Sequence, residues 1–344
     1  MTALTLHTNS RTYATSSDHD AGGDVLLPIV YHPSYSKPQL PPGHRFPMQI
    51  FRTIYDQLLR DKVCCHRQGA GPHPPPHLPT DEQLLMVHTP EYLSAFSSGT
   101  LETSLVRRIG FGAVVSSPDL IERTKAEVAG TLLTARLALK YGLACNVAGG
   151  THHAFADCGS GYCILNDLAV TTEVLLQEGA VQRVLILDLD VHQGDGTASI
   201  FSGRGDVFTL SVHAANNFPS RKQLSTLDVP LPDGTDDARY MAMLASVLPD
   251  VLSSFKPQLV LYDAGVDVHE SDALGKLALT DEGLLRREMM VLDTCLAAGI
   301  PVAGNVGGGY DADLEILARR HTALHRAASV MWDDHNLRSG TGFP

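Results

Sequence analysis

Clusters of basic residues, C-x-x-C cysteine pairs and long apolar runs are all missing from this sequence, and each absence excludes a class of protein. The 344 residues include 26 Lys and Arg against 38 Asp and Glu, which gives a formal charge of −12. Direct binding of nucleic acid depends on clustered Lys and Arg, so nucleic acid is not expected as a partner. The six cysteines show no C-x-x-C spacing, which argues against a zinc ribbon or a thioredoxin-like motif. This use of cysteine is typical of a reducing compartment, and we predict a cytoplasmic protein while leaving an organellar or nuclear location open.

No segment is apolar for long enough to predict a membrane span. The longest apolar stretch, at 132–148, is interrupted by Arg136 and Lys140. Residues 1–24 lack a hydrophobic segment and contain a single basic residue, Arg11, so no secretory signal is expected. The acidic residues in this stretch argue against an organelle transit peptide, and we predict a disordered N-terminal tail there.

Short β-type runs alternate along the chain with longer segments whose apolar residues recur at helical spacing. The expected strands are 25–31, 144–148, 184–188, 207–212, 259–262 and 301–306. The expected helices are 46–60, 118–141, 167–178, 238–254, 280–298 and 311–327. The alternation predicts a three-layer α/β/α fold, with an open, mostly parallel sheet and helices on both faces. A chain of this length fits one folded domain, which we place at 25–331 with a loose C-terminal tail at 332–344.

Polar and glycine-rich segments follow four of the expected strands. In open parallel sheets, ligands bind beyond the carboxyl ends of the strands, in the loops that lead into helices. The four segments are Gly149-Gly150-Thr151-His152-His153, Asp188-Leu189-Asp190-Val191-His192-Gln193-Gly194-Asp195-Gly196, Asp263-Ala264-Gly265-Val266-Asp267 and Gly307-Gly308-Gly309-Tyr310-Asp311. We therefore expect the four loops to form one site.

The second of these segments carries the spacing D-x-D-x-H directly after a buried apolar run. In extended backbone, residues two apart point the same way, so Asp190 and His192 can bind one ion together. Their oxygen and nitrogen donors suit Zn²⁺ or another first-row divalent metal. The alternative is a strand end whose polar residues cap the following helix. A catalytic zinc takes three protein ligands, and Asp267 is the natural third; Asp267 could also be a helix N-cap, and Asp272 is a competing ligand.

Two adjacent histidines and one tyrosine complete the candidate site. Neighbouring residues normally point apart, so His152 and His153 can serve one centre only in a bent loop, which the preceding glycines allow. Two imidazoles beside a cation do not both ionise, so at least one stays neutral and can act as a base. Three glycines before Tyr310 would bring its phenol over a metal-bound carbonyl; the alternative is an aromatic residue that packs on the core at a helix start.

Taken together, these segments resemble the arginase-like family of zinc-dependent deacetylases, which includes the histone deacetylases, acetylpolyamine amidohydrolases and acetoin-utilisation proteins. The resemblance covers nearly the whole chain and rests on the combination of GGTHHA, GYCILND, DLDVHQGDG, DAGVDVHESDALG and GGGYD, with added support from 40–48 and 87–92. The Gln after His192 and the form of DAGVDVHESDALG favour the class IV-like and bacterial branch. The resemblance implies an arginase/deacetylase-like fold and a deacetylase catalytic domain over 25–331.

The resemblance also implies which residues bind ions and which take part in the reaction. One catalytic Zn²⁺ would be held by three ligands: Asp190, His192 and Asp267. The reaction would depend on five further side chains: His152, His153, Tyr310, Asp188 and Asp195. In the family pattern His153 is the general base or acid, His152 assists electrostatically, and the two carboxylates orient the pair. Tyr310 hydrogen-bonds the carbonyl oxygen. A structural K⁺ is implied behind the site, at Asp188, the carbonyls of Asp190 and His192, and the Ser211–Val212 region.

Four residues are implied to bind the substrate in a narrow tunnel: Gly161, Tyr162, Phe218 and Leu274. Tyr162 replaces the usual Phe, which makes the tunnel more polar. Arg45 would face an internal channel for acetate release. No equivalent is found of the carboxylate with which the family grips the substrate backbone at the rim. Cys158 and Cys163 lie close to this region, where ordinary packing is a simpler interpretation than a redox switch.

The predicted function is a zinc-dependent deacetylase that removes acetyl or related acyl groups from lysine in proteins or peptides. One alternative substrate is an acetylpolyamine or another small acylated amine, which the negative charge of the chain would suit. A binuclear manganese hydrolase of the arginase type needs additional Asp and His ligands, and none is evident around 188–195 or Asp267. A non-catalytic acyl-lysine-binding scaffold would have lost Tyr310 or the histidine pair, all of which are present.

Overall fold

The fold is built on one parallel sheet in a computed structural model that describes residues 26–63 and 72–339. Within these residues, seven strands lie in the order β1-β2-β7-β6-β3-β4-β5, and every neighbouring pair is parallel. The strands are β1 Ile29–Val30, β2 Leu143–Asn146, β3 Val184–Asp188, β4 Val207–Ala214, β5 Leu227–Leu231, β6 Leu259–Asp263 and β7 Val302–Asn305. The predicted α/β fold with an open parallel sheet is confirmed. The tail expected at 1–24 lies outside the described residues.

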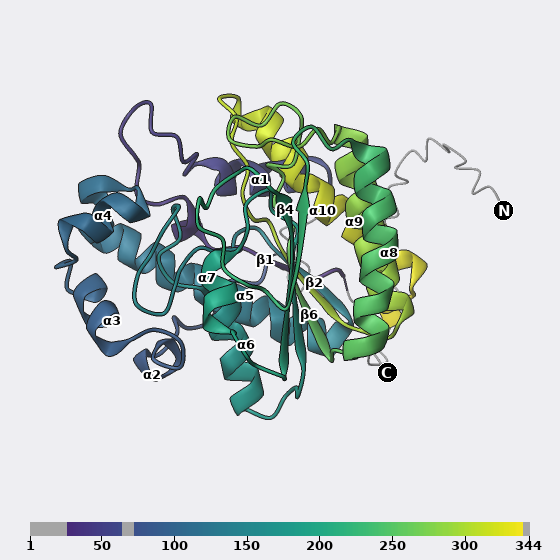
Figure 1. The fold of residues 1–344 in the computed structure, drawn as a ribbon, viewed down its shortest axis with the longest axis horizontal. Coiled ribbons are helices and arrows are strands. Elements are labelled where there is room, and N and C mark those ends of the chain that lie inside the picture. Colours follow the sequence, from purple (N-terminus) through teal and green to yellow (C-terminus); the bar gives the residue numbers. More distant parts are fainter. Residues whose placement is uncertain (1–25, 64–71, 340–344) are drawn as a thin grey trace.

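Helices cover both faces of the sheet. They are α1 Ile50–Arg60, α2 Asp81–Leu84, α3 Pro90–Ser97, α4 Thr103–Ile109, α5 Pro118–Tyr141, α6 Asp167–Gln177, α7 Asp195–Ile200, α8 Asp237–Phe255, α9 Asp281–Ala297 and α10 Leu314–Asp334. Figure 1 shows α8 and α9 on one side of the strands, with α5 and α6 on the other. Burial on both faces explains why the central strands read as continuous apolar runs rather than alternating ones: all five residues of β3 are buried. No helix in the described part of the chain is long and apolar enough to span a bilayer.

Helix α5 illustrates how local signals set the bounds of an element. Its N-cap Ser117 accepts a hydrogen bond from the backbone N–H of Leu120, and Pro118 occupies the first turn. It ends at Gly142, whose φ of 91° lies in a region that favours glycine. The helix predicted at 118–141 is confirmed at both ends.

Several short elements cannot be predicted from the spacing of apolar residues in the sequence. Edge strand β5 was not predicted, because Pro230 and its largely half-buried residues do not form an apolar run. The short helices α2, α3, α4 and α7 span at most eight residues each, too few to show a helical repeat.

The boundary expected between the domain and a C-terminal tail is wrong. Helix α10 continues to Asp334, and Trp332 is only 2% exposed. Leu337, in a following 3₁₀ turn, is also buried. Apolar contacts therefore hold the first residues of the expected tail, 332–337, on the domain.

Candidate active site

The candidate site lies at the carboxyl ends of four adjacent strands, β2, β7, β6 and β3. Strand register brings their last residues together: Asp188 of β3 pairs with Asp263 of β6, and Asp263 with Asn305 of β7. All three are buried. The four loops expected to converge do so, because parallel strands end at the same edge of the sheet.

The three expected metal ligands form one buried group. Ligand atoms of Asp190, His192 and Asp267 all lie within 4.8 Å of one another. The Nδ1 atom of His192 is 3.0 Å from Oδ1 of Asp190 and 3.1 Å from Oδ2 of Asp267. Each side chain is at most 9% exposed. Two carboxylates and one imidazole are thus grouped in a place where unpaired charge is costly.

The surroundings of this group fit a divalent cation. Oδ2 of Asp267 is buried and, among the described residues, faces only Nδ1 of His192 at 3.1 Å without a well-directed hydrogen bond, whereas Oδ1 accepts from the backbone N–H of Val191 at 2.8 Å. Glycines keep the space around the carboxylates open: a Cβ at Gly265 or at Gly308 would lie 2.4 or 2.5 Å from Oδ2 of Asp190. Burial, with the negative charge of Asp190, raises the pKa of Asp267 to about 7, so the carboxylates repel one another without a cation. A bound cation would remove that repulsion.

Asp272, the competing ligand, has another role. Its Oδ1 accepts hydrogen bonds from the backbone N–H groups of Leu274 and Gly275, and its Oδ2 accepts from the N–H of Tyr310 at 2.7 Å. It therefore joins the loop after β6 to the loop after β7. Asp272 is not a member of the group that could hold the ion.

The loop before the histidine pair is bent at two glycines. Gly149 and Gly150 have φ values of 94° and 81°. A Cβ on Gly150 would lie 2.5 Å from Oδ1 of Asp263, so a larger residue is excluded by space as well as by φ. Asp167 holds the bend by accepting hydrogen bonds from the N–H groups of Gly150 and Thr151.

The bent loop brings both imidazoles to one centre. Their ring centroids are 4.1 Å apart, with His152 Nδ1 2.8 Å from Asp188 and His153 Nδ1 2.7 Å from Asp195. Burial acts to lower the pKa of His152, but the surrounding carboxylates, Asp188 foremost, outweigh it and raise that pKa well above its usual value. Burial and the charge of His152 lower the pKa of His153 to about 4. These surroundings therefore favour the charged form of His152 and the neutral form of His153.

Tyr310 and the expected wall residues line one cavity of about 760 Å³. His153 and His192 lie at its inner end, and the walls include Gly161, Tyr162, Phe218 and Leu274. Burial, with the charges of Asp267 and Asp190, raises the pKa of Tyr310 well above its usual value. The phenol therefore stays protonated and can donate a hydrogen bond.

Aromatic contacts and a turn shape the inner part of the cavity. Phe218 packs edge-on against His153 with centroids 4.8 Å apart, and Tyr162 lies 6.2 Å from Tyr310. Tyr162 has φ +66°, unusual for a non-glycine residue, and its N–H is bound by the carbonyl of Ile109 at the end of α4. A Cβ at Gly161 would lie 2.8 Å from the His153 ring, so glycine lets the wall approach the imidazole. Buried Cys163 donates to the carbonyl of Gly161 at 3.7 Å, as expected for packing.

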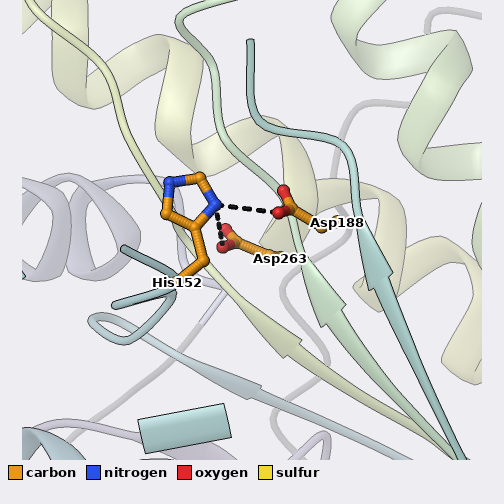
Figure 2. A group of neighbouring side chains, drawn as sticks. All are labelled: His152, Asp188 and Asp263. Atoms are coloured by element: carbon orange, nitrogen blue, oxygen red, sulfur yellow. Dashed lines mark hydrogen bonds and ion pairs between the residues drawn. The ribbon is translucent and has the colours of Figure 1, made fainter. Parts of the chain in front are cut away.

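A second buried group of possible ligands was missed in the sequence. Figure 2 shows the His152 ring facing Asp188 and Asp263, with Nδ1 2.8 Å from the first carboxylate and 3.7 Å from the second. Asp263 is fully buried, and neither of its oxygens accepts a hydrogen bond from any described residue. Burial and the charge of Asp188 raise its pKa well above the usual value. The sequence analysis found no additional Asp and His ligands for a second ion around 188–195 or Asp267, and it overlooked this group. The available signal was an acidic residue that ends an apolar strand beside Asp188.

A small internal cavity of about 50 Å³ is lined by both histidines and by Arg123 and Glu127 of α5. Nη2 of Arg123 is 2.9 Å from Oε1 of Glu127, and both side chains are at most 3% exposed. Arg45, which was expected to face such a channel, is exposed and lines the outer cavity instead. Its neighbour Phe46 lines the internal cavity, because adjacent residues of this loop point to opposite sides.

The region expected to bind K⁺ is also assembled at the strand ends. Asp188 of β3 is the register partner of Ser211 of β4, and both are buried. Ser211 Oγ lies 3.0 Å from Nδ1 of His213.

Comparisons with known proteins agree on one family and one fold. A model of the histone deacetylase domain matches residues 44–327. An uncharacterized protein of Picosynechococcus sp. is 54% identical over 302 residues, which is 88% of this chain and 98% of that protein. The acetoin utilization protein AcuC of Staphylococcus aureus is 31% identical over 258 residues, 69% of this chain and 66% of that protein. The crystal structure of the HDA15 HD domain superposes with a TM-score of 0.72 at 22% identity, over 87% of each chain, and shows the same fold.

Proposed function

Because the chain belongs to the histone deacetylase domain family, we propose that it is a metal-dependent hydrolase that removes acetyl or related acyl groups from lysine side chains of proteins or peptides. The observation that carries the proposal is that one cavity is lined by Tyr310, by His153 of the histidine pair and by His192 of the group that could hold an ion. Such an arrangement suits hydrolysis of an amide.

In this proposal Asp190, His192 and Asp267 hold Zn²⁺. When bound there, Zn²⁺ would polarise the acyl carbonyl and acidify a water molecule. We also propose that a structural K⁺ ion binds near Asp188 and Ser211.

The protein's own groups move the protons. Nε2 of His153 is the ring nitrogen not bonded to Asp195, and it accepts a proton from the water that attacks the carbonyl carbon. The Tyr310 hydroxyl donates a hydrogen bond to the carbonyl oxygen as negative charge develops on it. When the C–N bond breaks, His153 returns the proton to the amine nitrogen, which leaves as the free amine beside a carboxylic acid. His152, held charged by Asp188, favours the negative charge of the transition state.

The test is hydrolysis of acetyl-lysine and longer acyl-lysine peptides by metal-loaded protein. His153→Ala and Tyr310→Phe are expected to lower kcat by about tenfold to a hundredfold while zinc content stays at one ion per chain. Tyr141→Phe, at the far end of α5 and outside the cavity, is a matched control that should keep full activity. Full activity in either site variant would reject the role assigned to that residue.

A binuclear hydrolase is a second candidate, favoured by the additional group of His152, Asp188 and Asp263. The hydrogen bond between His152 and Asp188 competes with binding of a second divalent ion to these two side chains. The mononuclear enzyme is therefore favoured. Elemental analysis separates the two, since a binuclear enzyme would hold two divalent ions in active protein. A non-catalytic scaffold is not favoured, because Tyr310 and both histidines are in place.

A further inference from the structure

The outer part of the cavity has a charge opposite to that of the whole chain. The chain carries a formal charge of −12, yet three arginines line the cavity: Arg45, Arg108 and Arg221. We call these three residues the arginine rim. The one carboxylate in the lining, Asp195, is hydrogen-bonded to His153 at the inner end. The rim is therefore positive, and the described residues of the lining place no other carboxylate beside it.

The three guanidinium groups come from separate segments that the fold brings together. Arg45 lies in the loop before α1, Arg108 is the next-to-last residue of α4, and Arg221 lies between β4 and β5. All three residues are exposed. Since they are far apart in sequence, the positive rim is a product of the tertiary structure.

None of the rim arginines forms an ion pair with a carboxylate in residues 26–63 and 72–339. Other arginines of the chain do: Arg204, for example, lies 2.5 Å from Glu173 and 2.8 Å from Asp206. The rim guanidinium groups are thus available to a ligand, and guanidinium binds carboxylate and phosphate through paired hydrogen bonds.

The position of Arg108 is set by the same turn that shapes the tunnel. Its carbonyl accepts the N–H of Gly161 at 3.2 Å, and its guanidinium lies 4.9 Å from the centroid of Phe155, another lining residue. Lys222, which follows Arg221 in the sequence, donates to the carbonyls of Asn217 and Pro219, two residues of the lining. Its ammonium adds to the positive potential beside Arg221.

We propose that the arginine rim binds a carboxylate or phosphate group on the amine part of the substrate, so that the enzyme selects acylated amines with an anionic substituent over acylated polyamines. This inference rests on the proposed function, because it assigns a substrate class to the same cavity. A polyamine keeps positive charge beyond its acylated nitrogen and would meet the rim with like charge. The source of the anionic group is either an acidic residue beside an acyl-lysine or a small acylated amino acid.

The test compares amides that share an acetyl group and differ in charge. The peptide arm uses acetyl-lysine flanked by Asp, Asn or Lys. The small-molecule arm uses an acetylated ω-amino acid and a monoacetylated diamine of the same chain length. We expect kcat/KM to be roughly tenfold higher for Asp-flanked than for Lys-flanked peptide at low salt, through KM, and the ratio to shrink as salt screens the exposed charges. The two arms show whether a peptide or a small molecule is preferred.

Substitution of the rim tests the residues themselves. The triple variant Arg45→Gln, Arg108→Gln, Arg221→Gln is expected to bring the Asp-to-Lys ratio close to one by raising KM for the acidic peptide. Arg286→Gln is the matched control, because Arg286 is an exposed arginine on α9 outside the cavity lining. Fluorescence polarisation of labelled acetylated peptides on the His153→Ala variant measures binding apart from turnover.

The possible results distinguish failure of the arginine-rim proposal from failure of the proposed hydrolase function. Equal kcat/KM for Asp- and Lys-flanked peptides, or a preference for the monoacetylated diamine, would overturn the proposed role of the arginine rim and leave the proposed hydrolase function unaffected. If no amide is hydrolysed, the proposed function fails. The arginine rim would still be supported if the Asp-flanked peptide binds more tightly than the Lys-flanked peptide and if the triple variant loses this difference. Equal binding of both peptides would overturn it.

Discussion

At the scale of single residues, burial and neighbouring charges together shift the pKa values of side chains of the same type in different directions. His152 and His153 are neighbours in sequence, yet only His152 is surrounded by several carboxylates. Glu127 is a second example: burial raises its pKa to about 7 although Arg123 opposes the shift. Such a carboxyl takes up a proton in the folded state at a pH where the unfolded chain has already lost it.

Glu127 therefore links stability to pH. Below about pH 4.5 the carboxyl is protonated in both states, and stability is lost as the pH rises through the folded pKa of about 7. Since one pKa unit corresponds to roughly 1.4 kcal/mol, the free energy of unfolding of the wild type should fall by up to about 3 kcal/mol relative to Glu127→Gln over this range. Urea unfolding at several pH values measures the difference. Exposed Glu91→Gln is the control, and parallel pH profiles for wild type and Glu127→Gln would contradict the prediction.

At the scale of elements, helix α9 holds two of the loops that carry the proposed ion ligands. Arg287 on α9 is fully buried, and its Nη1 donates to the carbonyls of Leu189 at 3.1 Å and Gly265 at 2.8 Å. Its Nη2 lies 2.5 Å from Oε1 of Glu288. One side chain thus joins the residue before Asp190 to the loop before Asp267.

Arg287→Lys should loosen both loops, because one ammonium cannot reproduce the fork of the guanidinium. We expect zinc affinity to fall about tenfold, as is usual when a group that orients metal ligands is changed. Arg287→Met should cost about 3–5 kcal/mol of unfolding free energy, since it leaves Glu288 buried without its partner. Chelator competition and urea unfolding measure the two effects, with Arg286→Gln as the control. Unchanged zinc affinity in Arg287→Lys would show that the two loops keep their geometry without the hydrogen bonds of the Arg287 guanidinium.

At the scale of the whole molecule, a sheet edge concentrates negative charge inside an already acidic protein. Four buried aspartates meet there: Asp188, Asp190, Asp263 and Asp267. Their mutual repulsion opposes folding unless a cation or protons neutralise it. The native fold alone assembles the ligands, so the ion should stabilise the folded state.

Removal of the ion should therefore lower the melting temperature. Treatment with a chelator is expected to shift Tm down by about 5 °C, and added zinc should restore it, because a ligand that binds only the native state stabilises it by mass action. Asp267→Asn should show a much smaller response to zinc. Differential scanning fluorimetry measures both, and a Tm that is indifferent to chelator and zinc in the wild type would argue against a native-state ion at this site.

The amino-acid sequence by itself determined the fold class, the parallel sheet and most of its strands, because apolar runs and glycine or N-cap signals are local. The D-x-D-x-H spacing likewise pointed to Asp190 and His192 as a pair, since extended backbone places alternate residues on one side. Only the tertiary structure decided which carboxylates share the ion group, how Asp263 joins His152, and that Arg45 lines the outer cavity with Arg108 and Arg221. These residues come from separate segments, so their contacts depend on strand register and loop packing, which no local pattern encodes.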